Sequence, residues 1–228
     1  HGRRSYKMTP VQVFQFSNIK GFYKDKIHRL IHDAIFFVPR KFGKTSSVTS
    51  LAIDDFLFGD TNAQIYTAAN TYKQAQICFK EISKIMKGLD GHLAHFKLNR
   101  DMISWKDSPD RDSSIQCLSS NADKLDGLNA STVIMDEYSQ ADSSALYQVL
   151  TTSMGMRENP LTMVITTASD KPDAPFAQML RGAKKVLRGE IENDSLFAHI
   201  FEPDADDKEG DPRTWRKVQP HLGITIKE

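Results

Sequence analysis

Residues 38–45 read Val-Pro-Arg-Lys-Phe-Gly-Lys-Thr, and they stand between an apolar run and a helical pattern. The run at 34–38 has the length of a buried strand, and residues 44–58 repeat apolar side chains at helical spacing. A strand-to-helix turn that ends in Gly-Lys-Thr is typical of a loop that binds phosphate, because backbone N–H groups and a helix N-terminus face the anion. A tight turn with an exposed lysine is the alternative, and it leaves Lys44-Thr45 at the helix start unexplained.

The residue types of this loop suit a nucleoside triphosphate and its metal ion. Gly43 lets the backbone approach the phosphates, Lys44 supplies a cation to them, and Thr45 supplies a hydroxyl to Mg²⁺. Val38 stands where the usual pattern has its first glycine. We expect the loop to bind ATP through Pro39, Arg40, Lys41, Phe42, Gly43, Lys44, Thr45 and Ser46.

A second apolar run, at 132–135, ends in the acidic pair Asp136 and Glu137. Parallel sheets bind their ligands at the carboxyl ends of the strands. We therefore expect Asp136 to hold Mg²⁺ together with Thr45, and Glu137 to polarise the attacking water. An acidic pair after a strand is otherwise a helix cap with an acidic first turn, but the phosphate loop upstream favours the catalytic interpretation.

Apolar runs and helical patterns alternate along the rest of the chain. Strands are predicted at 63–68, 161–166 and 196–201, and helices at 10–22, 72–86, 145–154 and 175–187. This alternation predicts an α/β fold, a mostly parallel sheet that is flanked by helices. Together with the phosphate loop and the acidic pair, it indicates a P-loop NTPase of the ASCE type. Residues 96–118 predict a meander that adds an antiparallel extension.

Two further segments carry weaker predictions. Thr166 and Thr167, at the tip of a predicted strand, either contact the γ-phosphate or the acidic pair, or fill the strand end as β-branched residues do. Residues 204–211 are rich in aspartate and poor in apolar residues. We expect residues 1–203 to form one domain and residues 204–228 to form an acidic, solvated linker.

Composition excludes several classes of protein. The chain has 228 residues and a formal net charge of +1, which argues against a strongly basic, histone-like DNA binder. Its two cysteines exclude a disulfide framework and a four-cysteine zinc site, and they predict buried free thiols. The sequence shows neither an apolar run of membrane-spanning length nor a signal peptide, so a cytoplasmic setting is expected.

Residues 8–223 resemble the ATPase domain of the large terminase subunit, the DNA-packaging motor of tailed bacteriophages. The most specific part of the resemblance is the loop, since the family often carries Pro-Arg-Lys-x-Gly-Lys-Ser/Thr, which residues 39–45 match. Asp136-Glu137 is similar to the family's Walker B pair, and residues 124–128 look like the usual approach to that strand. Thr166, Thr167 and Ala168 are similar to the coupling motif that follows.

The resemblance also implies roles for more distant residues. Pro10-Val11-Gln12 is similar to the family's adenine motif, although Val11 replaces an aromatic residue. Gln12 could then read the adenine edge through its amide, with Gln15 as a competitor and a surface helix residue as the alternative. Arg40 is implied to stabilise the γ-phosphate, so that the catalytic set is Glu137, Lys44 and Arg40. Candidates for an arginine given to a neighbouring subunit are Arg100, Arg111 and Arg157, with Lys124 as a further basic residue.

The function that the resemblance implies is ATP hydrolysis that powers packaging of double-stranded viral DNA into a procapsid. The expected partners are double-stranded DNA without sequence preference, a portal protein, a small terminase subunit and further copies in a ring, with a monomer expected in isolation. Residues Lys184, Lys185 and Arg188 form either a DNA face or a solvated helix face. The host cytoplasm is the expected location, and DNA cleavage is not expected from this chain. A helicase-type ATPase and a non-enzymatic binding module are the rival hypotheses.

Overall fold

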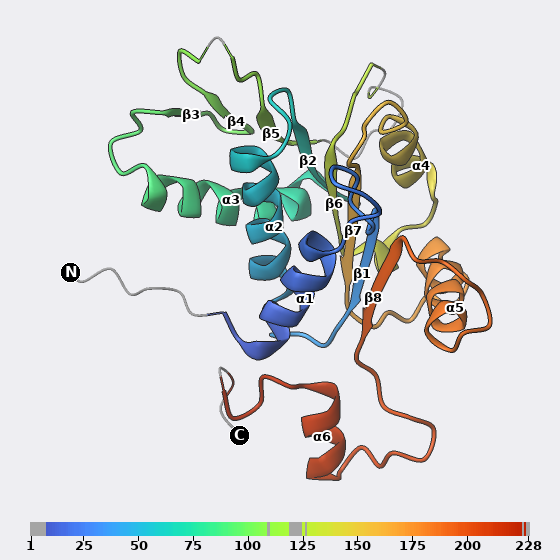
Figure 1. Cartoon of the computed structure of the whole chain (residues 1–228). Helices are drawn as coiled ribbons and strands as arrows, with labels where there is room; N and C mark the ends of the chain where they lie inside the picture. Colours follow the sequence, from blue (N-terminus) through green and yellow to red (C-terminus); the bar gives the residue numbers. More distant parts are fainter. Residues whose placement is uncertain (1–7, 109, 119–124, 126, 225, 227–228) are drawn as a thin grey trace.

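The computed structural model describes residues 8–108, 110–118, 125, 127–224 and 226. One eight-stranded sheet crosses the molecule in the order β3-β4-β5-β2-β6-β7-β1-β8 (Figure 1). The strands are β1 (Asp33–Phe37), β2 (Gln64–Ala69), β3 (Phe96–Leu98), β4 (Met102–Trp105), β5 (Ser114–Cys117), β6 (Thr132–Asp136), β7 (Leu161–Thr166) and β8 (Leu196–Ile200). In the order across the sheet, every neighbouring pair of strands from β5 through β2, β6, β7 and β1 to β8 is parallel. Strand β4 pairs antiparallel with both β3 and β5. The predicted fold, a mostly parallel sheet with an antiparallel extension, is confirmed.

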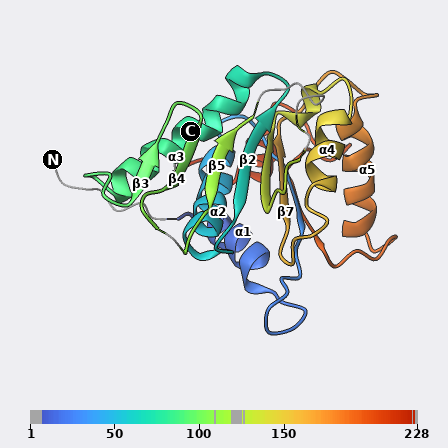
Figure 2. The same cartoon turned by 90° about the horizontal axis from the view of Figure 1, so that it is seen from above.

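Helices cover both faces of this sheet. Helices α1 (Pro10–Gly21), α2 (Lys44–Phe58) and α3 (Tyr72–Leu89) pack on one face, and α4 (Ala145–Thr152) and α5 (Pro175–Leu187) pack on the other (Figure 1, Figure 2). Neighbouring residues of β6 are buried on opposite faces of the sheet. Ile134 belongs to the core under α2 and α3, and Val133 belongs to the core under α4. A strand whose two sides are both buried in this way has to be apolar throughout, as the run at 132–135 is.

The acidic C-terminal segment is more ordered than the sequence predicts. It forms helix α6 (Pro212–Val218), which Asp211 caps by accepting a hydrogen bond from Arg213 N at 2.8 Å. Lys217 binds Asp204 and Asp207 and so neutralises part of the acidic run. His221 is only 2% exposed. The segment thus contains a helix and a buried histidine beside exposed aspartates, and the division of the chain at residue 203 stays a prediction.

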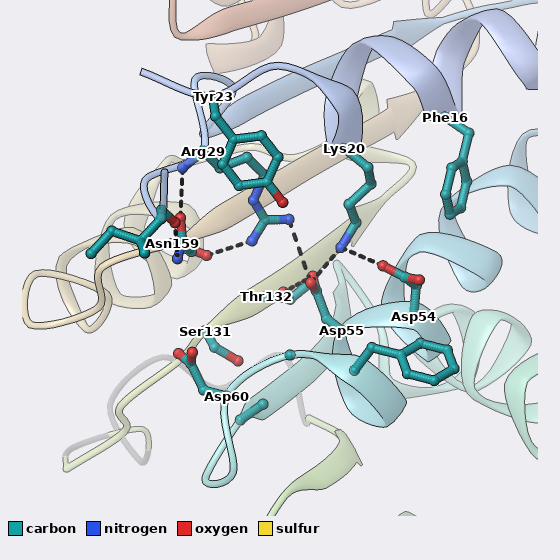
Figure 3. Close-up of a pocket in the computed structure, with 14 residues that line it drawn as sticks. Phe16, Lys20, Tyr23, Arg29, Asp54, Asp55, Asp60, Ser131, Thr132 and Asn159 are labelled. Carbon is teal, nitrogen blue, oxygen red and sulfur yellow. Dashed lines mark hydrogen bonds and ion pairs between the residues drawn. The ribbon is translucent and has the colours of Figure 1, made fainter. Parts of the chain in front are cut away.

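A buried ion network holds the far end of α2, at the sheet edge where β6 begins. Figure 3 shows Lys20 of α1 and Arg29 of the following loop both reaching Asp55, whose Oδ2 accepts a 2.6 Å hydrogen bond from Thr132. Arg29 also donates to the carbonyl oxygen of Asn159 at 2.7 Å. The residues of this network line a cavity of about 390 Å³. Their ion pairs and hydrogen bonds connect α1 and α2 to the sheet. Among the described residues, no helix is long and apolar enough to cross a lipid bilayer.

We predict that Asp55→Ala lowers the free energy of unfolding by about 3 kcal/mol, because the Lys20 and Arg29 side chains, 13% and 7% exposed, lose their shared counter-charge. Urea denaturation measures the loss. Asp54→Ala is the matched control, since its carboxylate is 34% exposed and binds Lys20 alone, so about 0.5 kcal/mol is expected. Equal losses in the two variants would show that Asp55 does not organise the network.

Candidate active site

The loop between β1 and α2 is shaped by two residues in the left-handed region. Lys41 has φ 65° and Gly43 has φ 85°, and Phe42 N donates to the carbonyl oxygen of Pro39 at 3.3 Å. Gly43 is the N-cap of α2, and no side chain caps the helix there. Backbone N–H groups in such a curved loop, together with an uncapped first turn, form a concave site for an anion. This is the geometry that the quoted loop sequence predicts.

The acidic pair lies opposite the start of α2. Asp136 ends β6, and Glu137 follows in the left-handed region with φ 52°. The Lys44 ammonium binds Glu137 Oε1 and lies 3.5 Å from Asp136 Oδ1. Two segments that are 93 residues apart in the chain therefore share one site. Had they been on different sides of the sheet, a common site for phosphate and metal would have been impossible.

Asp136 sits in an apolar environment that makes its charge costly. The residue is 4% exposed, and burial raises the pKa of its carboxyl group, an effect that Lys44 partly opposes. Oδ2 accepts a hydrogen bond from the Cys78 thiol on α3, with 3.5 Å between sulfur and oxygen. Burial and the neighbouring carboxylate raise the pKa of Cys78, so the thiol is protonated and can donate. Both predicted free thiols are buried.

The donor set at this edge suits Mg²⁺. Among the described residues, the buried Asp136 Oδ1 makes no hydrogen bond and has only the Lys44 ammonium 3.5 Å away. Thr45 brings a hydroxyl in the first turn of α2. Within the part of the chain that the structure describes, no three His, Cys, Asp or Glu side chains are grouped to hold a metal by themselves. Mg²⁺ normally takes one or two carboxylates and completes its shell with water and substrate phosphates. The residues therefore fit a magnesium ion that arrives with a phosphate ligand.

Thr166 links the two halves of the site. Its Oγ1 donates to Ser139 Oγ at 2.7 Å and accepts from Ser139 N at 3.1 Å, in the turn that follows the acidic pair. Its carbonyl oxygen accepts from Val38 N, at the entry of the phosphate loop, at 3.2 Å. Thr167 is buried and Ala168 is exposed. Thr166 thus hydrogen-bonds both to the turn after the acidic pair and to the start of the phosphate loop.

The two glutamines of α1 occupy different surroundings. Gln12 Oε1 accepts from Thr9 N at 3.0 Å in a capping box, and a Cβ at Gly43 would lie 3.9 Å from Gln12 Nε2. Gln15 binds His199 Nδ1 at 3.0 Å. Burial lowers the pKa of His199 to about 4, so this ring is neutral at neutral pH. Gln12, which is 5% exposed, is therefore the glutamine beside the phosphate loop and is not a surface residue.

The C-terminal segment also contacts the loop, which no pattern in the sequence predicts. The Phe42 ring lies 4.7 Å from the His221 ring and 5.2 Å from the Phe201 ring, measured between centroids. Gln219 Nε2 donates to the carbonyl oxygen of Arg40 at 3.1 Å, whereas the Arg40 side chain is exposed. His221 is the one residue that a sequence search could have noticed, as an isolated histidine near apolar neighbours.

The three candidate arginines lie near different ends of the strands. Arg157 donates to Asn62 and Asn129, which precede β2 and β6, and Arg111 donates to the carbonyl oxygen of Leu57 at the end of α2. Both therefore lie near the amino ends of the strands, on the opposite side of the sheet's strand ends from the phosphate loop. Arg100 is exposed in the turn between β3 and β4, near the carboxyl end of β5. Lys124 and the approach segment at 124–128 lie outside the described residues, apart from positions 125, 127 and 128.

Residues 10–185 match the family model of the terminase large subunit, ATPase domain. The chain belongs to this family. The predicted resemblance to the bacteriophage large terminase subunit and the P-loop NTPase fold are confirmed.

Two solved structures share the fold of this chain, and one protein shares part of its sequence. The crystal structure of the HK97 bacteriophage large terminase aligns with a TM-score of 0.81 and 20% identity, covering 99% of this chain and 46% of that one. The large terminase of a thermophilic bacteriophage, in complex with ADP, aligns with a TM-score of 0.58 and 11% identity, covering 91% and 49%. Protein YmfN of Escherichia coli strain K12 is 34% identical over 101 residues, which is 44% of this chain and 22% of YmfN. The chain thus spans less than half the length of each of these proteins.

We predict that Cys78→Ala weakens magnesium-dependent nucleotide binding about fivefold, because Asp136 Oδ2 loses the hydrogen bond that orients it. Titration calorimetry with an ATP analogue, with and without Mg²⁺, measures the change. Cys117→Ala is the matched control, because it removes the other buried thiol, which among the described residues makes no hydrogen bond to Asp136. The same loss in both variants would mean that only packing is affected.

Proposed function

We propose that this chain is the ATPase part of a large terminase and hydrolyses ATP to drive double-stranded DNA into a procapsid. Family membership supports the reaction class. The observation that carries the proposal is the contact of Lys44 with both Asp136 and Glu137. This contact brings a candidate phosphate-binding lysine, a candidate metal-binding carboxylate and a candidate water-activating carboxylate into one place, and phosphoryl transfer uses these three kinds of group together.

The triphosphate would lie along residues 39–46. Gly43 and the first turn of α2 would offer N–H groups to it, and the exposed Arg40 guanidinium would reach the γ-phosphate. Gln12, beside Gly43, would bind the adenine edge. Mg²⁺, held by Thr45 and Asp136 when bound, would neutralise charge on the β and γ oxygens.

Lys44 would change partners when the substrate binds. A triphosphate carries more negative charge than the acidic pair, so the ammonium is expected to move from Glu137 to the phosphate oxygens. Glu137 is 28% exposed at its side chain and would then be free to orient the attacking water and accept its proton. Binding would thus prepare the catalytic carboxylate.

Thr166, Thr167 and Ala168 would pass the loss of γ-phosphate to the rest of the domain. The support is that Thr166 hydrogen-bonds to both Ser139 and Val38, which would lie on either side of the phosphate in the proposed site. A shift of either segment changes the hydrogen bonding of the other. Order-to-disorder and small segment shifts after γ-phosphate loss are a common way of switching in nucleotide hydrolases.

The proposed partners follow from the motor function. They are double-stranded DNA, bound through its phosphates without sequence preference, a portal protein, a small terminase subunit and further copies of the chain in a ring. The proposed location is the cytoplasm of the host cell. Stimulation of ATP turnover by single strands rather than duplexes would instead favour the helicase-type alternative.

We predict that Lys44→Ala abolishes ATP binding and turnover, whereas Glu137→Ala and Glu137→Gln keep binding and lose turnover by about 100-fold or more. Lys44 is needed for the phosphates, but Glu137 acts only on water. Calorimetry and a phosphate-release assay separate the two effects. Full turnover in Glu137→Gln would remove Glu137 from the catalytic role, and retained binding in Lys44→Ala would refute the phosphate loop.

We predict that Thr166→Val lowers turnover about tenfold with little change in nucleotide affinity, because valine keeps the strand filled but loses the two bonds to Ser139. Thr162→Val on the same strand is the matched control, since Thr162 is buried and its hydroxyl donates to the sulfur of Met154, away from the phosphate loop. Both variants are compared in the same release assay. Equal rates would show that the Thr166 hydroxyl takes no part in coupling.

A further inference from the structure

Helix α3 presents a stripe of lysines on its outer face. Lys73, Lys80, Lys84 and Lys87 are all exposed, with Ile77 as the fifth member of the stripe. At 100° per residue these positions fall within about 80° of the helix circumference and extend over about 21 Å. The buried residues of α3, among them Phe79 and Ile82, lie on the opposite side. The stripe therefore faces away from the core.

The charge on this face is largely unbalanced. Glu81 is the single acidic residue within α3, and its Oε2 lies 3.9 Å from Lys84 Nζ. Among the described residues, no carboxylate lies within ion-pair distance of Lys73, Lys80 or Lys87. The whole chain has a net charge of only +1, so this helix holds a local excess of positive charge.

Helix stability does not account for these positions. Lys80 and Lys84 are four residues apart, and like charges at this spacing destabilise a helix by about 0.2–0.5 kcal/mol. Lys73 lies in the first turn, where the helix dipole disfavours a cation. Lys87, in the last turn, and Lys84, three residues after Glu81, are placed favourably, whereas Lys73 and Lys80 are not. Residues that break a local rule in this way are expected where function requires them.

Helix α5, on the other face of the sheet, is the weaker candidate. Lys184 lies 2.6 Å from Glu202 and Arg188 lies 3.8 Å from Glu190, so two of its cations are already paired. Lys184 and Lys185 are also in the last turn, where the helix dipole explains them. The hypothesis of a DNA face on α5 therefore loses most of its support.

We propose that the lysine stripe of α3 is the surface on which this domain holds the phosphate backbone of duplex DNA. The proposal rests on the proposed function and assigns its DNA contact to one helix face. One DNA strand carries about six phosphates along 21 Å, enough to face all four ammonium groups. Flexible lysines without hydrogen-bonding geometry to base edges give binding without sequence preference, as a translocating motor requires.

The test is the salt dependence of duplex binding by the whole chain. Fluorescence anisotropy with two labelled duplexes of unrelated sequence, from about 20 to 200 mM salt, gives the slope of log K against log salt. For Lys73→Gln/Lys80→Gln/Lys84→Gln/Lys87→Gln the slope should become shallower by about 3 to 4, since each lost phosphate contact removes about 0.9. Both duplexes should give the same result. The unfolding temperature should not fall and ATP-analogue binding should be unchanged, because the stripe is exposed and lies on the face of α3 opposite Cys78, the residue of this helix that contacts Asp136.

The matched control is Arg181→Gln/Lys185→Gln/Arg188→Gln on α5, which should leave the slope within about 1 of the wild-type value. A normal slope in the α3 variant, or a larger change in the α5 variant, overturns the assignment while leaving the proposed function intact. A wild-type chain that turns over ATP but binds no duplex at low salt overturns both the α3 surface and the DNA part of the proposed function. A slope that differs between the two sequences would also contradict a backbone-only contact.

Discussion

The site depends on a charge contact that the sheet topology alone makes possible. Lys44 begins the helix after β1 and Asp136 ends β6, yet β7 lies between these two strands. The lysine side chain spans that strand to reach the carboxylates. Because Asp136 is almost fully buried, an unpaired charge there would be costly, so the ammonium and the carboxylates constrain one another's positions. Parallel pairing of β6, β7 and β1 sets the distance over which this contact forms.

β7, the strand between β6 and β1, does more than set their separation, because it also bonds to both segments. Thr166 ends β7 directly between the two charged segments and bonds to the chain on both sides of them. Thr166 is thus the residue whose hydrogen bonds connect the start of the phosphate loop with the turn after the acidic pair. The C-terminal segment adds a second contact through Phe42 and His221, which connects the loop to residues that follow the sheet. Both contacts reach the phosphate loop, one at Val38 and the other at Phe42.

Sequence reasoning located elements of the fold where consecutive residues mark them. The loop at 38–45 and the pair Asp136-Glu137 each follow an apolar strand, so the pattern alone predicts where they lie in the sheet. It failed where a contact joins residues far apart without a local signal. His221 meets Phe42 from the other end of the chain, and Asp55 gathers Lys20 and Arg29 from different elements. No periodicity marks such partners, because tertiary packing alone decides them.

The far end of α2 is fixed by buried charge, and this limits how the domain can respond to its ligand. Asp55, in the last turn, binds Lys20 and Arg29 and accepts a hydrogen bond from Thr132, so tilting the helix would break this network. Breaking a buried pair costs about 3–5 kcal/mol, more than a small shift of an exposed loop. Movement on phosphate binding is therefore expected in the loop, in the turn after Glu137 and in the C-terminal segment, while α2 stays in place as the fixed reference.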